Sequence, residues 1–109
     1  MNEIMSDNYS IMVIETYTKT KTDASTLAQI AQNAGAIGTD RYRLPPSKKV
    51  FKIPELEREW IVEILCSESM VNDMEEIIRK HHPESFPPIS TQKIMLSKTS
   101  MESILNIGE

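Results

Sequence analysis

The sequence has little of several features that would assign a protein to a class at once. Its single cysteine cannot form an internal disulfide, so a reducing compartment is the default. No apolar run approaches the ~20 residues of a membrane-spanning helix. The formal charge of −4 offers no net basic surface for nucleic acid. The first residues carry acids rather than the basic and apolar regions of a signal peptide, so we expect a cytoplasmic protein without a membrane span or a nucleic-acid partner.

Catalytic and phosphate-binding motifs are also missing. Only three glycines are present, and the loop G-x-x-x-x-G-K-[ST], which cradles phosphates, does not occur. No nucleophile can be placed beside a base from its spacing, because no Ser-His-Asp or Cys-His arrangement can be recognised. Aromatic residues make up 6% of the chain, and the expected strands lack the exposed aromatic pairs on which RNA bases stack. The sequence therefore does not indicate an enzyme.

What the sequence does contain is a series of short segments with strand character. Residues 60–66 are apolar at almost every position, which predicts a strand covered on both faces. Residues 10–18 have the same composition, and residues 89–96 run extended after a pair of prolines. In residues 36–44 the last four side chains alternate between charged and apolar or aromatic, as in an edge strand. Four strands are therefore expected.

Two amphipathic helices separate these strands. Gly35 follows the first helix directly and supplies the left-handed position that commonly ends a helix. Pro83 ends the second helix, because it pushes His82 out of the α region. The expected N-caps are Thr22 or Asp23 for the first helix and Ser67 or Ser69 for the second. The expected buried stripes are Ala24, Leu27, Ala28, Ala31 and Ala34 in the first helix, and Met70, Met74, Ile77, Ile78 and His81 in the second.

The order of these elements predicts an α+β fold, the ferredoxin-like βαββαβ sandwich. Right-handed crossovers place both long helices on one face of the sheet, with the first and third strands in its centre. Residues 1–8 are expected to form a flexible tail, and residues 9–109 a single domain. An exposed hairpin or ribbon around Lys48–Ile53 precedes the third core strand, and a short C-terminal helix starts at Thr99 or Ser100.

The two central strands carry apolar side chains on both of their faces. A two-layer sandwich covers only one face of its sheet, so the other face would remain in water. Leaving each such side chain exposed forfeits roughly 1.5–3 kcal/mol. Burying that face against copies of itself is the direct remedy, and the sequence thus predicts a homo-oligomer.

The segment from Trp60 to Ile94 resembles the CutA divalent-cation-tolerance family, a branch of the wider PII-like group. The likeness lies in the apolar strand, the amphipathic helix and the run His82-Pro83-Glu84-Ser85, and it has some specificity over about three fifths of the chain. The resemblance implies a homotrimer whose sheets face inward, with ligands in the clefts between subunits. The family's cysteine in the second strand and its paired hairpin tryptophans are missing here.

Candidate metal ligands occur in two groups. Glu15 and Glu63 lie in the middle of apolar strands that are expected to be neighbours, where two desolvated carboxylates would attract a cation or pair with Lys or Arg. His82 and Glu84 form the second group, although His82 is also expected to fix the end of the helix. Adjacent helical residues point ~100° apart, so His81 and His82 do not readily reach one ion. As a third reading, Glu15 and Glu63 would act as general acid and base.

One basic concentration stands out in this acidic protein. Its cations flank the expected ribbon, where they would hold a phosphate or carboxylate between subunits, or discourage aggregation of a sheet edge. We therefore expect a homotrimeric CutA/PII-like regulatory or signalling protein that binds a small anionic effector or a divalent cation. The alternative is a scaffold or adaptor that binds a protein partner through its edge strand and ribbon. The candidate effector-binding residues are Arg41, Arg43, Lys48, Lys49 and Lys52.

Overall fold

The computed structural model describes residues 8–45 and 58–97. Its elements are β1 (Asn8–Thr18), α2 (Lys21–Asn33), β2 (Gly38–Arg43), β3 (Trp60–Cys66), the 3₁₀ turn η3 (Glu68–Met70), α3 (Val71–His81) and β4 (Ile89–Ser97). Strand β3 has the predicted bounds, whereas β1 begins two residues earlier than expected. The predicted ribbon around Lys48–Ile53, the C-terminal helix and residues 1–7 of the tail lie outside the described residues.

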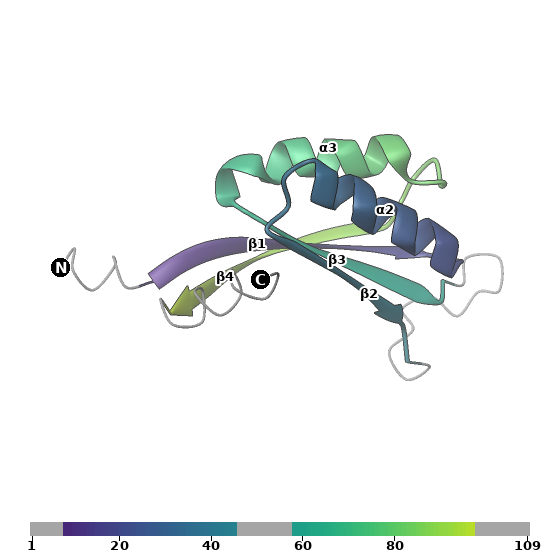
Figure 1. Ribbon diagram of the computed structural model, residues 1–109, viewed down its shortest axis with the longest axis horizontal. Helices are drawn as coiled ribbons and strands as arrows, with labels where there is room; N and C mark the ends of the chain where they lie inside the picture. The colour runs from purple at the N-terminus through teal and green to yellow at the C-terminus, as the bar shows by residue number, and fades with distance from the viewer. Residues whose placement is uncertain (1–7, 46–57, 98–109) are drawn as a thin grey trace.

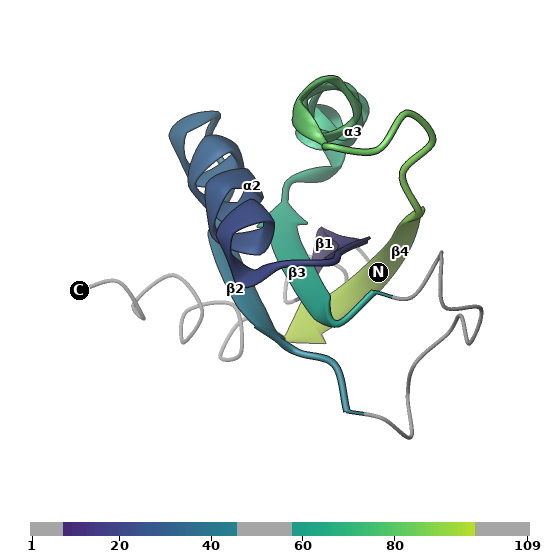
Figure 2. The same ribbon diagram turned by 90° about the vertical axis from the view of Figure 1, so that its right-hand side faces the viewer.

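The four strands form one antiparallel sheet in the order β2-β3-β1-β4. The first and third strands are therefore central, as predicted. Both helices cover the same face of the sheet, which is visible in Figure 1 and from the side in Figure 2. This two-layer arrangement confirms the ferredoxin-like α+β fold. No helix in the described ranges is long and apolar enough to cross a membrane.

The helix-covered face contains the main apolar core. Along β1 and β3 the even-numbered residues point toward the helices, where Ile14, Val62 and Ile64 are completely buried. The odd-numbered residues point to the opposite side of the sheet, which we call the far face. On these two strands the far face carries Ile11, Val13, Glu15, Tyr17, Ile61, Glu63 and Leu65. The two faces of the central strands are thus both largely apolar, as the sequence predicts.

Helix α2 starts at a different residue from the one expected. Its N-cap is Thr20, whose hydroxyl oxygen accepts a hydrogen bond from the backbone N–H of Asp23 at 3.1 Å. The prediction of Thr22 or Asp23 is therefore wrong, because Thr20 already satisfies a first-turn amide and both predicted residues lie within the helix. The predicted stripe is confirmed, since Ala24, Leu27, Ala28 and Ala31 are buried and Ala34 is half-buried.

The turn after α2 depends on Gly35. Its φ of +106° lies in the region that L-residues rarely adopt, and an added Cβ would lie 3.1 Å from the Met70 Cε. We expect Gly35→Ala to lower the free energy of unfolding by about 1–2 kcal/mol in urea titrations. Gly38→Ala is the matched control, since a Cβ there meets Leu65 at an ordinary 3.6 Å. Equal losses in the two variants would contradict this account of Gly35.

Helix α3 is preceded by the turn η3, and neither serine caps it as predicted. Ser67 precedes η3 without a side-chain cap bond, and its Oγ lies 3.1 Å from the Oγ of Ser69. The expected end of the helix is confirmed, because His82 has extended backbone angles (φ −68°, ψ 139°) before Pro83. The predicted buried stripe includes one error: Met74 and Ile78 are buried, Met70 and Ile77 half-buried, and His81 exposed.

Candidate functional site

Two carboxylates lie side by side in the centre of the far face. Glu15 in β1 and Glu63 in β3 are direct partners in the antiparallel register, so their side chains emerge on the same face at the same level. Both are half-buried. The hydroxyl of Tyr42, from the edge strand β2, donates a hydrogen bond to Glu63 Oε2 at 2.9 Å. The structure thus brings together two of the predicted site residues and adds a tyrosine that the sequence analysis did not single out.

A hollow of about 360 Å³ surrounds this carboxylate pair. It lies where β1 and β2 end and β3 begins. Its wall is lined by Glu15, Tyr17, Tyr42, Leu44, Pro45, Ile61 and Glu63, and we refer to it below as the hollow. Tyr17 and Tyr42 both pair with Ile61 in the register, one from β1 and one from β2, so their side chains lie on the far face next to Glu63. The available signal in the sequence was that Tyr17 follows Glu15 by two positions and therefore shares its face of the strand. The hollow combines an apolar wall with two carboxylates and two phenols.

The electrostatics of the hollow favour protonated groups. Burial raises the pKa of Glu15, and the hydrogen bond and the negative charge of Glu63 raise it further. Burial together with the hydrogen bond to Glu63 raises the pKa of Tyr42 to about 12. The pKa of Tyr17 is also raised, first by burial and then by the charges of the two glutamates. Both phenols are therefore neutral hydrogen-bond donors at neutral pH, and a bound cation would relieve the repulsion between the carboxylates.

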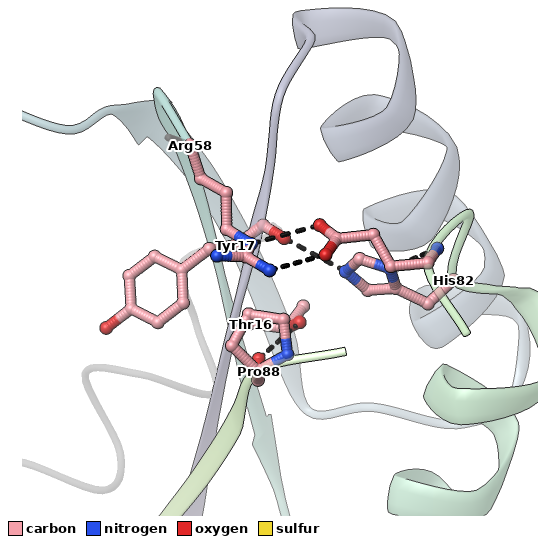
Figure 3. A network of polar contacts seen from close by, with 6 residues as sticks. Thr16, Tyr17, Arg58, His82 and Pro88 are labelled. Carbon is pink, nitrogen blue, oxygen red and sulfur yellow. Dashed lines mark hydrogen bonds and ion pairs between the residues drawn. The ribbon is translucent and has the colours of Figure 1, made fainter. Parts of the chain in front are cut away.

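A second polar cluster lies on the other side of β1, at the end of the helix layer (Figure 3). Arg58 is 7% exposed, and its guanidinium binds Glu84 through two hydrogen bonds, of which Nε–Oε2 measures 3.0 Å. These bonds from Arg58 lower the pKa of Glu84. Thr16 donates its hydroxyl proton to the carbonyl oxygen of Pro88 at 2.8 Å. The cluster therefore connects the end of β1 to the chain between α3 and β4. It also connects that chain to Arg58, which lies two residues before β3.

Both ring nitrogens of His82 are engaged in this cluster. Nε2 lies 2.9 Å from the carbonyl oxygen of Tyr17, which can only accept, so Nε2 carries the proton. Nδ1 accepts the backbone N–H of Glu84 at 3.1 Å. With both ring nitrogens engaged in hydrogen bonds, His82 has no lone pair left for a metal ion. The ring N–H of His82 donates to a carbonyl oxygen of β1. The prediction that the His82 side chain fixes the end of its own helix is therefore wrong.

The four predicted metal ligands are therefore not one site. The far face holds Glu15 and Glu63, whereas His82 and Glu84 belong to the cluster with Arg58. Arg58 itself was not predicted, because residues 55–59 read as a charged turn. The spacing of two residues between Arg58, Trp60 and Val62 was the available indication, because it places the three side chains on the helix-covered face of the sheet.

The predicted basic site is only partly described by the structure. Arg41 and Arg43 are exposed on β2, and the Arg43 Nη2 lies 3.5 Å from the Glu59 Oε2. Arg41 borders a shallow space of about 180 Å³ beside α2, together with Gln29, Gln32 and Thr39 among others. Lys48, Lys49 and Lys52 lie outside the described residues. The described part of the chain thus places two of the five cations on one edge strand.

The donors on the far face fit a cation that prefers oxygen. Carboxylate and hydroxyl oxygens are the ligands of Mg²⁺, Ca²⁺ and Mn²⁺, whereas thiolate and imidazole favour Cu and Zn. Cys66 is completely buried on the helix-covered face, where burial raises the pKa of its thiol. No group of three His, Cys, Asp or Glu side chains within residues 8–45 and 58–97 is arranged to hold a metal. A cation at Glu15 and Glu63 would therefore need ligands from water or another copy of the chain.

Comparison with known proteins identifies the fold. No protein-family model and no curated protein matches this chain. Among solved structures, CutA from Synechococcus elongatus is 18% identical with a TM-score of 0.71, covering 94% of this chain and 98% of that one. CutA1 from Oryza sativa is 15% identical with a TM-score of 0.71, covering 91% and 93%. The divalent cation tolerance protein CutA1 from Thermus thermophilus is 14% identical with a TM-score of 0.66, covering 87% and 94%. The chain therefore has a CutA-like fold.

Proposed function

We propose that this chain is a homotrimeric, cytoplasmic CutA/PII-like regulatory protein that binds a divalent cation between its subunits. The observation that carries the proposal is the in-register pair of Glu15 and Glu63 on a largely apolar face that the helices do not cover. In this proposal residues 9–109 form one domain, and the protein acts by binding rather than by catalysis. The cation would sit on Glu15 and Glu63.

The far face supports assembly on energetic grounds. Val13, Tyr17 and Leu65 are only half-buried there, and covering such side chains contributes roughly 1.5–3 kcal/mol each. Three copies that turn this face inward would remove all of them from water. Solved structures with the same fold are named for divalent-cation or divalent-ion tolerance, which motivates a cation as the first ligand to test.

The far face also favours a cation over a small anion. Two carboxylates in one hollow repel an anionic effector, and they repel each other less once a cation lies between them. An anionic effector would instead use the exposed cations of β2, Arg41 and Arg43, and would lie on the helix side of the sheet. The two ligand classes are thus assigned to different residues, which allows them to be tested separately.

The edge strand supports the alternative function, a scaffold or adaptor. Strand β2 pairs with β3 on one side only in the described sheet, and its side chains from Asp40 to Arg43 are exposed. An extended peptide of a partner could add to such an edge. This alternative predicts no stabilisation by metal ions.

We expect Mg²⁺, Mn²⁺ or Ca²⁺ to raise the melting temperature of the protein in a saturable way. A cation at about 100 times its dissociation constant stabilises the folded state by about 2.7 kcal/mol. Glu15→Gln and Glu63→Gln should abolish most of this shift, because each variant removes one of the two charges that hold the ion. The measurement is thermal unfolding followed by circular dichroism over a metal titration.

Glu76→Gln is the matched control for this titration, since Glu76 is an exposed carboxylate on α3. It should leave the metal-induced shift intact. A shift that survives Glu15→Gln and Glu63→Gln undiminished would rule out the pair as the cation site. A shift produced by nucleotides and lost in Arg41→Ala would favour the anionic effector instead.

A further inference from the structure

Phe86 is unusually exposed for a large apolar side chain. It is 92% exposed, whereas the other exposed large hydrophobics in the described residues, Tyr42 and Met95, are 38% and 61% exposed. It lies in residues 83–88, which connect α3 to β4 and which we call the Phe86 loop. Keeping a phenyl ring in water is unfavourable, so a side chain held in this position is a candidate contact for another molecule.

The Phe86 loop is anchored at both of its ends. On the α3 side, His82 binds the Tyr17 carbonyl, and Glu84 forms its two bonds with Arg58. On the β4 side, the carbonyl oxygen of Pro88 accepts the Thr16 hydroxyl proton. Prolines at 83, 87 and 88 restrict the backbone further. Because the loop is already ordered, burying Phe86 in a partner would cost little additional conformational entropy.

The hollow on the far face is complementary to this side chain. Its wall presents the rings of Tyr17 and Tyr42 with Leu44, Pro45 and Ile61, and its volume of about 360 Å³ has room for a phenyl ring. The last turn of α3, which leads into the Phe86 loop, carries the cations Arg79 and Lys80, of which Arg79 also pairs with Glu75 at 3.7 Å, so this end of the subunit is basic where the hollow is acidic.

The Phe86 loop and the hollow of one chain lie on opposite sides of the sheet. The loop is anchored on the helix side of β1, and the ring of Tyr17 points the other way (Figure 3). The loop leads into β4 at one edge of the sheet, whereas the hollow extends toward β2 at the other edge. Contacts between two different surfaces of identical chains run head to tail, and they close into a ring when the rotation allows it.

We propose that Phe86 of each subunit inserts into the hollow of the next subunit and closes the wall around its Glu15 and Glu63. The inference rests on the proposed homotrimer, and it assigns a residue that each copy contributes to the site of its neighbour. The phenyl ring screens the carboxylate pair from bulk water, which strengthens the attraction between the pair and a bound cation that keeps its own water ligands. The cation site is then complete only in the assembled protein.

The first test measures how Phe86→Ala changes assembly. Truncation of a central aromatic contact is expected to raise the concentration at which the oligomer half-dissociates by about 30-fold, as measured by sedimentation equilibrium. Met95→Ala is the matched control, because Met95 is also exposed but lies on β4 away from the hollow, and it should leave dissociation unchanged. The folded monomer should melt as before in both variants, since neither side chain belongs to the core.

The second test locates the contact by cross-linking. Phe86→Cys protein is mixed with Pro45→Cys protein, and a short bismaleimide is added. A cross-linked dimer should form in the mixture and not with either variant alone, while the buried Cys66 of the wild type should not react. If the wild type is a monomer by mass, the proposed trimer fails together with this inference. The inference alone is overturned if the wild type is an oligomer but two results are negative. These are that Phe86→Ala half-dissociates at the same concentration as the wild type, and that the mixture gives no cross-link.

Discussion

Replacing Arg58 with alanine is expected to lower the free energy of unfolding by about 3 kcal/mol and the melting temperature by roughly 15 °C. Arg58 is 7% exposed, and its guanidinium binds the Glu84 carboxylate through two hydrogen bonds. Its removal leaves Glu84 without these bonds in a site that is only partly open to water. The loss also loosens the connection of the chain before β3 to the Phe86 loop. Urea and thermal unfolding would measure both quantities.

Two variants serve as controls for Arg58. Arg43→Ala breaks an ion pair in which the arginine side chain is 70% exposed, and a loss below about 1 kcal/mol is expected because water screens such pairs. Arg58→Lys keeps the charge but cannot form both hydrogen bonds, so its stability should lie between the wild type and Arg58→Ala. Similar losses in Arg58→Ala and Arg43→Ala would show that the buried pair does not stabilise the fold.

The same pair makes stability depend on pH in a defined direction. The hydrogen bonds from Arg58 lower the pKa of Glu84 below its ordinary value of 4.5. A carboxyl whose pKa is lower in the folded state stabilises that state above its ordinary pKa, and this contribution disappears as the pH falls through the folded value. The difference in unfolding free energy between the wild type and Glu84→Gln should thus be constant near neutral pH and shrink below pH 4.5. A difference that grows on acidification would contradict the assignment.

Replacing Leu65 with lysine is expected to dissociate the proposed trimer into folded monomers. Leu65 lies on the far face, paired in register with Val13, and is half-buried in the single chain. In the trimer each copy would bring a charge into the apolar contact, where a charge without a partner is costly. Weakening of assembly by about a hundredfold or more is expected, because each 1.4 kcal/mol corresponds to a factor of ten. Light scattering coupled to size-exclusion chromatography would report the mass.

Controls for Leu65 separate a loss of assembly from a loss of folding. Gln29→Lys adds the same charge on the exposed side of α2, and Leu65→Met keeps the volume and the apolar character, so both should remain trimeric. Circular dichroism should show that Leu65→Lys keeps its secondary structure. A Leu65→Lys protein that has the mass of a trimer at low micromolar concentration would show that the far face is not the interface.

Local patterns in the sequence predicted the four strands and the two long helices in their order, but not the 3₁₀ turn η3 that precedes α3. The apolar run from Trp60 to Cys66 predicts β3 with its bounds, and Pro83 places the end of α3, because each depends on side-chain periodicity or on the geometry of one peptide unit. The order of the elements and the rule for right-handed crossovers then led to the sheet and to its two central strands. The adjacency of Glu15 and Glu63 followed from the same reasoning.

Tertiary structure alone decided how the polar residues are grouped. His82 and Glu84 are separated from Glu15 and Glu63, because they bind a buried arginine and a β1 carbonyl on the helix side of the sheet, whereas the two glutamates emerge on the far face. Strand parity indicates the face on which Arg58 and Tyr17 lie, but it does not give their partners, since those contacts join residues far apart in the chain. A sequence pattern reports which face of a strand a residue occupies, whereas the partner across that face depends on how the whole chain folds.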